Sequence, residues 1–187
     1  MSTPTDRPLY LDHYVQALED GDSEAALRIL QQACTDHPGS GTPHALLAAQ
    51  LMHAGEVDAA EAAFIRALAL DPDLSTARFQ LGLLQFTSAR PQTAFQTWAP
   101  LETLGESHYL VCFKRAFAAL AMDSFDDALF LIEQGMSRND ENAPLNQDMG
   151  MLAAHIRTQS GDASTDSAVP QNEAAAQFVL ASYKQNL

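Results

Sequence analysis

Six histidines, two cysteines and several neighbouring carboxylates are the side chains of this sequence that could do chemistry. Histidine and cysteine bind zinc or act as base and nucleophile, so their spacing decides whether such a site can form. No two histidines stand four residues apart with a glutamate directly after the first, which excludes that zinc motif. His44 and His53 share a predicted helix, but nine residues separate them by about 13 Å along its axis. The sequence therefore predicts no metal site and no cofactor.

Other catalytic signatures are missing as well. No phosphate-binding loop, dinucleotide-binding glycine motif or serine nucleophile elbow occurs in the chain. Carboxylate pairs such as Asp126 and Asp127 stand at predicted helix starts, where acidic side chains serve as caps. Cys34 and Cys112 are far apart at apolar helical positions, which favours core packing over a disulfide or a metal site. We expect a protein that is not an enzyme.

The composition narrows the class of partner. A net charge of −14 leaves little room for the clustered lysine and arginine that bind nucleic acid. No apolar run approaches the roughly 20 residues that cross a bilayer. The first 30 residues carry no basic segment followed by an apolar one, so no signal peptide is predicted. These features predict a cytoplasmic protein that neither binds nucleic acid nor inserts into a membrane.

A period of 34 residues positions the side chains of this chain. An alanine followed four residues later by a large apolar residue recurs four times: Ala26 with Leu30, Ala60 with Phe64, Ala94 with Trp98, and Ala128 with Ile132. Two further pairs keep the same period: Gly21 with Gly55, and Pro38 with Pro72. Such a pattern is typical of repeated helical hairpins, because the small residue lets two helices cross closely and the large one fills the space beside it.

Residues 41–74 carry the pattern most completely and resemble the tetratricopeptide-repeat family. Eight residues fall on that family's signature positions: Leu47, Ala48, Leu51, Gly55, Ala60, Phe64, Ala67 and Pro72. The resemblance extends over about residues 7–158, with departures at Gln85, where an aromatic is usual, and Glu106, where proline is usual. It implies an all-α fold, an α-solenoid of about four helical hairpins plus a capping helix and a C-terminal tail helix.

The repeat register predicts where each helix lies. Helices are expected over residues 7–19, 23–36, 43–54, 57–70, 75–88, 91–104, 109–121 and 125–137, with a capping helix over 143–157. Pro100 falls inside the sixth of these and predicts a kink or an early end at Ala99. We therefore expect a repeat domain over residues 1–158, a flexible linker over 159–170, and a tail with a short helix over 171–187.

The resemblance also implies where a partner would bind, because the first helix of each hairpin lines an inner groove in this family. The inward positions carry apolar side chains in all four repeats: Leu11, Val15, Leu18, Ala45, Ala49, Met52, Phe79, Leu83, Phe86, Phe113, Phe117 and Leu120. A repeat domain that grips a C-terminal carboxylate would place lysine, arginine and asparagine there. We expect an apolar groove instead. Under the alternative, several of these residues pack between neighbouring repeats and never reach a groove.

Two functions fit this reading. The leading hypothesis is an adaptor or scaffold that binds an apolar peptide or helix of another protein in its groove. The alternative is a secretion chaperone, because the size, acidity and residues 77–83 resemble the chaperones of type III secretion translocators. In the tail, Phe178, Val179 and Tyr183 form an apolar face that could dock into the groove of the same or a neighbouring subunit. Homodimerisation through the tail or the first helix is left open.

Overall fold

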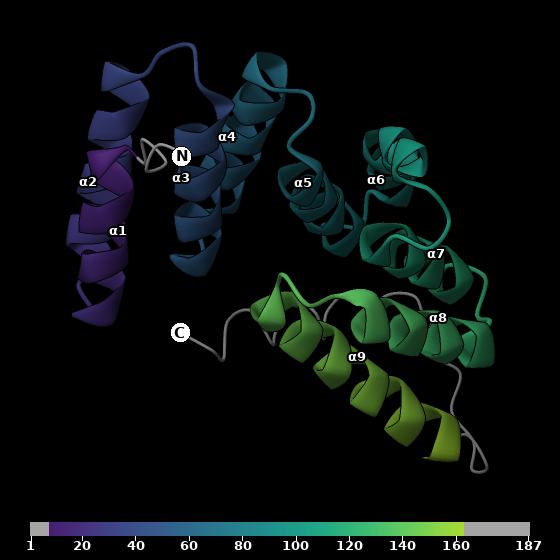
Figure 1. Ribbon diagram of the computed structural model, residues 1–187. Helices are drawn as coiled ribbons and strands as arrows, with labels where there is room; N and C mark the ends of the chain where they lie inside the picture. The colour runs from purple at the N-terminus through teal and green to yellow at the C-terminus, as the bar shows by residue number, and fades with distance from the viewer. Residues whose placement is uncertain (1–7, 163–187) are drawn as a thin grey trace, which may run out of the picture. The chain divides into compact units, whose positions relative to one another are not determined.

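The computed structural model describes residues 8–162, with side chains described as far as residue 158. Within that range the chain is built of helices and contains no strand. In chain order they are α1 (Leu9–Glu19), α2 (Ser23–Asp36), α3 (Gly41–His53), α4 (Val57–Leu70), α5 (Ser75–Thr87), α6 (Pro91–Trp98), the 3₁₀ helix η1 (Ala99–Leu104), α7 (Tyr109–Leu120), α8 (Phe125–Arg138) and α9 (Ala143–Asp162) (Figure 1). The predicted all-α fold is confirmed.

The chain divides into two compact units between Ala77 and Arg78. The first unit holds two hairpins, in which α1 packs on α2 and α3 packs on α4. The second holds most of α5, followed by α6, η1, α7, α8 and α9, with α7 packed on α8 and α8 on α9.

The turns of the first unit follow the repeat. Gly21 and Gly55 adopt φ values of +69° and +77°, a left-handed conformation that glycine takes without strain. The side chain of Asp22 accepts a hydrogen bond of 2.8 Å from the backbone N–H of Ala25 and so caps α2. These two turns bring the two helices of each hairpin together.

The repeated alanines lie at helix crossings, as the period predicts. Ala26 and Ala60 in the first unit and Ala94 and Ala128 in the second are each fully buried. The large residues four positions later are buried as well: Leu30, Phe64, Trp98 and Ile132. The 34-residue period therefore marks the cores of both units.

Pro100 ends the sixth helix early. Helix α6 stops at Trp98, one residue before the predicted end, and the chain continues as the 3₁₀ helix η1. Proline lacks a backbone N–H and crowds the carbonyl four residues before it, so the α-helix cannot continue through this position.

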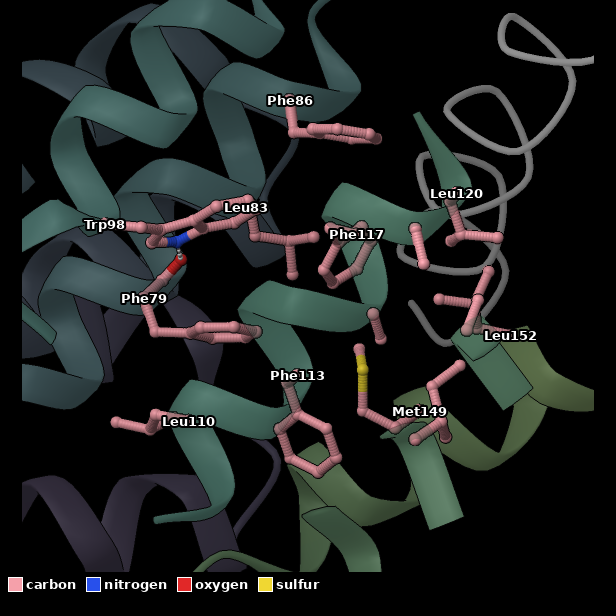
Figure 2. Close-up of a cluster of buried hydrophobic side chains, with 14 of the residues drawn as sticks. Phe79, Leu83, Phe86, Trp98, Leu110, Phe113, Phe117, Leu120, Met149 and Leu152 are labelled. Atoms are coloured by element: carbon pink, nitrogen blue, oxygen red, sulfur yellow. Dashed lines mark hydrogen bonds between the residues drawn. The ribbon is translucent and has the colours of Figure 1, made fainter. Parts of the chain in front are cut away.

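Trp98 organises the core of the second unit. Its indole N–H donates a 2.9 Å hydrogen bond to the Phe79 carbonyl oxygen, which Figure 2 draws as a dashed line. The ring lies against Gly82 of α5, where a Cβ atom would overlap it. Glycine at this position therefore lets the indole pack directly on the α5 backbone.

The last helix is longer than predicted. Helix α9 extends to Asp162, so residues 159–162, predicted to belong to the linker, are helical. The predicted tail residues Phe178, Val179 and Tyr183 lie outside the described residues, and their docking stays a prediction. Cys34 and Cys112 are free thiols, half-buried and buried respectively.

Candidate protein-binding face

The structure corrects half of the predicted groove. In the second unit the six groove positions are at most 4% exposed: Phe79, Leu83, Phe86, Phe113, Phe117 and Leu120. They belong to a single buried cluster together with Trp98 and the apolar side of α9. The prediction that these six side chains line an open groove is therefore wrong, and the alternative of packing between helices holds for them.

Mutual packing of aromatic rings explains why these six side chains are buried. The ring centroid of Phe117 lies 5.2 Å from that of Phe86 and 5.5 Å from that of Trp98, and Phe79 lies 5.6 Å from Trp98. These are favourable spacings for aromatic pairs (Figure 2). Nine of the twelve residues of helix α7 are buried, and its two charged residues, Lys114 and Arg115, lie at half-buried positions.

Phe113 packs against α8 because a glycine leaves space for its ring there. Its ring lies against Gly135 of α8, where a Cβ atom would overlap it. Gly135 occupies the repeat position that holds Ala33 and Ala67 in the first two repeats. Glycine lacks the methyl group of these alanines and so leaves space for a ring. This substitution is the feature of the sequence that could have predicted Phe113 inside the α7/α8 hairpin.

The equivalent positions of the first unit remain partly open to solvent. Val15 is 38% exposed and Leu18 is 44% exposed on α1. The corresponding residues of α3 stand 34 positions later and are half-buried. We refer to the six side chains together as the α1/α3 face: Leu11, Val15, Leu18, Ala45, Ala49 and Met52.

A partly buried hydrogen bond joins the two helices of this face. The amide nitrogen of Gln50 on α3 donates a 2.7 Å bond to the hydroxyl oxygen of Tyr14 on α1. Burial raises the pKa of Tyr14 above its usual value of 10.0, and the Gln50 bond partly opposes that rise. Leu46 and Leu47 of α3 pack against the same Tyr14 cluster. Because the two helices are tied at this point, their equivalent residues keep a fixed relation.

The described part of the first unit is rich in carboxylates. Residues 8–77 contain eleven aspartates and glutamates but only two lysines or arginines, Arg28 and Arg66. Arg28 already pairs with Glu24 at 2.9 Å. On α1, Asp12 and Glu19 are exposed and directly follow Leu11 and Leu18 of the face. The apolar surface therefore has an acidic border.

Comparison with known proteins assigns the repeat. Residues 17–85 match the family described as Tetratricopeptide repeat. This segment includes the three residues that α3 contributes to the α1/α3 face, Ala45, Ala49 and Met52. The matched segment consists of tetratricopeptide repeats. Two solved structures are similar to it, each at 12% sequence identity, and both are forms of MamA, a tetratricopeptide-repeat protein.

The similarity to both structures runs over nearly the whole chain. Residues 41 to the end of MamA from Desulfovibrio magneticus RS-1 align with a TM-score of 0.59, covering 98% of this chain and 96% of that one. The MamA RS-1 ArsTM double mutant aligns with a TM-score of 0.58, covering 99% and 98%. No curated protein sequence matches the chain. The predicted tetratricopeptide-repeat solenoid is therefore confirmed as the fold.

Tetratricopeptide repeats, matched here over residues 17–85, are a non-catalytic fold that binds other proteins. Among the residues the structure describes, no group of three or more histidine, cysteine or acidic side chains could hold a metal ion. None of the helices described is both long and apolar enough to cross a membrane.

A pocket of about 440 Å³ between α1 and α2 was not expected from the repeat. Tyr10 and His37 line it with ring centroids 5.4 Å apart, together with Leu9, Ile29 and Asp36. The first hairpin of a repeat stack usually carries a polar outer side, because no hairpin precedes it. The apolar Leu9, Tyr10 and Ile29 are therefore the signal that sequence reasoning overlooked.

Proposed function

We propose that this tetratricopeptide-repeat chain binds an apolar helix or peptide of another protein through the α1/α3 face. The observation that carries the proposal is the exposure of Val15 and Leu18, at positions whose counterparts in the second unit are sealed. Covering a large apolar side chain is worth about 1.5–3 kcal/mol when burial is complete. A partner that covers these residues gains a share of that free energy.

The arrangement of the face suits a helical segment. Leu11, Val15 and Leu18 follow the spacing of one helix side, and their counterparts on α3 repeat it. A single helix lying along two neighbouring helices places its own apolar row between them, which is a common mode of peptide recognition. The Tyr14–Gln50 bond supports this mode because it fixes one row relative to the other.

A paired charge substitution tests the proposal. We expect Val15→Glu with Leu18→Glu to weaken binding of a fluorescein-labelled 18-residue amphipathic helix by tenfold or more. The matched control is Ile65→Glu on α4, which is 53% exposed in the same unit but outside the face. Fluorescence anisotropy titration measures both. Equal loss of affinity in the two variants, or no loss in either, would remove the α1/α3 face as the binding site.

The same double variant separates an adaptor from a chaperone once a natural partner is known. A chaperone keeps a hydrophobic client soluble, so the double variant should leave the client insoluble when the two are co-expressed. An adaptor binds a partner that is soluble alone, so the double variant should only prevent co-purification. Both outcomes depend on the α1/α3 face.

A further inference from the structure

We infer that the segment bound by the α1/α3 face is a basic amphipathic helix, whose lysines or arginines lie over Asp12 and Glu19. This inference rests on the proposed function. It adds the sign of the charge on the partner and the helix of the face, α1, that the charged edge of the partner contacts. It is carried by the position of two exposed carboxylates beside the apolar row of α1 and by the absence of charged residues from α3.

The acidic border lies on one edge of the apolar row. Asp12 follows Leu11 and Glu19 follows Leu18, so both carboxylates stand on the same side of α1. They are seven residues apart, which is two helical turns or about 10.5 Å. Both residues are exposed. Two carboxylates at this spacing match cations two turns apart on a partner helix.

The other edge of the face carries no acidic side chain. Helix α3, Gly41–His53, contains no aspartate, glutamate, lysine or arginine. The two arginines of residues 8–77 lie on other helices, Arg28 on α2 and Arg66 on α4. The charge next to the face is thus concentrated on α1. A bound helix should therefore turn its basic edge towards α1 and its neutral edge towards α3.

Electrostatics of this kind set partner choice and association rate more than total affinity. Exposed charges interact over about 10 Å at 0.1 M salt and are screened over shorter distances at higher salt. A helix with acidic flanks would bring like charges next to Asp12 and Glu19, which opposes binding. The face should accordingly discriminate between helices that share an apolar row but differ in flanking charge.

The experiment uses the full chain and three labelled 18-residue helical peptides with the same leucine row. Their polar positions carry lysine, glutamine or glutamate. At 50 mM salt we expect the lysine peptide to bind at least tenfold more tightly than the glutamine peptide, and the glutamate peptide to bind most weakly. Raising the salt to 500 mM should remove most of this difference.

Two charge-matched variants locate the effect. Asp12→Asn with Glu19→Gln should reduce the affinity for the lysine peptide at least threefold and leave the glutamine peptide unchanged. Asp140→Asn with Glu141→Gln removes two exposed carboxylates from the turn before α9 in the second unit. This control variant should bind the lysine peptide within twofold of the unmodified chain. Equal losses in the two variants would overturn the inference, since general attraction to an acidic chain would then explain the preference.

Failure of the inference can be told apart from failure of the proposed function. If the three peptides bind equally and all lose affinity in the Val15→Glu, Leu18→Glu variant, the face binds helices without regard to charge and only the inference fails. If no peptide is affected by that variant, the proposed function fails.

Two other occupants of the face are outcomes of the same series. Tighter binding of the lysine peptide to a Phe178→Ala, Tyr183→Ala chain, which has the same charge, would identify the tail as the occupant. Conversion of a dimer to a monomer by Val15→Glu with Leu18→Glu, seen by light scattering, would identify a second copy. Either result would overturn the inference, whereas unchanged affinity and unchanged mass support it.

Discussion

The two units of this chain place the same repeat positions in opposite environments. Val15 and Leu18 of the first unit are 38% and 44% exposed, while Leu83 and Phe86, each 68 residues later in the same register, are 3% and 4% exposed. All four are apolar residues on the first helix of a hairpin. The register alone therefore does not decide which of them is available to a partner.

The difference lies in what surrounds each position. In the second unit Phe86 meets Phe95, Trp98 and Phe117, with ring centroids between 5.2 and 6.1 Å apart. In the first unit the six equivalent positions carry no aromatic ring, and alanine, aliphatic and methionine side chains cannot pack ring against ring in this way. An inward side chain is buried where large aromatic rings pack around it, and it stays exposed where its neighbours are small.

The strongest way to test this contrast is to place a carboxylate at one position of each unit. Leu83→Glu buries a charge without a partner, and we expect it to lower the free energy of unfolding by about 3–5 kcal/mol. Val15→Glu, at the equivalent but exposed position, should change it by no more than about 0.5 kcal/mol. Urea unfolding measures both.

Trp98 makes this measurement specific. It is the one tryptophan of the chain and lies in the second unit, so its fluorescence follows that unit while circular dichroism follows all helices. Leu83→Glu should shift the fluorescence transition to lower urea. A shift of equal size for Val15→Glu would show that the two environments are not different after all.

Much of the fold could be predicted because the 34-residue period depends on contacts within a hairpin. Ala26 and Ala60 predict close helix crossings, and Gly21 and Gly55 predict the turns between them. Pro100 predicts the end of α6, because proline has no backbone N–H and so interrupts the helix at its own position, independently of distant residues. These features need only residues near one another in sequence.

The exposure of the groove positions could not be predicted in the same way. Whether Phe113 turns towards a groove or towards α8 depends on Gly135, 22 residues later, and on the space that a missing methyl group leaves there. Whether Phe79 is covered depends on the indole of Trp98 from another helix. The burial of each side chain depends on several residues that are distant in sequence. The family pattern therefore does not determine which groove positions are exposed.

Two glycines at one repeat position give a second, smaller test of the closed cluster. Gly82 of α5 and Gly150 of α9 are 68 residues apart, but only Gly82 lies against an aromatic ring. Gly82→Ala should lower the free energy of unfolding by about 1–3 kcal/mol, because the new methyl group displaces Trp98. Differential scanning calorimetry would show this as a lower melting temperature.

Gly150→Ala is the matched control. A Cβ atom there would meet only the Met136 methyl group at 3.7 Å, which is ordinary contact. Alanine stabilises a helix interior by about 0.5–1 kcal/mol relative to glycine, so this variant should be neutral or more stable. If Gly82→Ala were equally stabilising, the indole would not be packed as closely on α5 as the structure shows.

The smallest expected effect concerns the ion pairs of the two units. In the second unit the Lys114 ammonium lies 2.8 Å from a Glu102 carboxylate oxygen, and Arg115 lies 3.3 Å from the other. The hydrogen bond from Lys114 is the main reason that the pKa of Glu102 lies below its usual 4.5, although partial burial opposes it. The first unit offers the exposed pair of Arg28 and Glu24 for comparison.

Acid should therefore weaken the second unit through Glu102. Because the folded state lowers the pKa of this carboxyl, its stabilising contribution is complete above pH 4.5 and is lost as the pH falls through the lowered value. Since Glu102 is about half exposed, solvent limits that contribution to less than about 1 kcal/mol. Glu102→Gln should lower the urea midpoint of the Trp98 fluorescence transition slightly at pH 7, and the difference from the unmodified chain should shrink below pH 4.5. Glu24→Gln, in the first unit, should leave that transition unchanged at pH 7. A pH-independent effect of Glu102→Gln would mean that Glu102 stabilises the second unit by packing rather than by its charge.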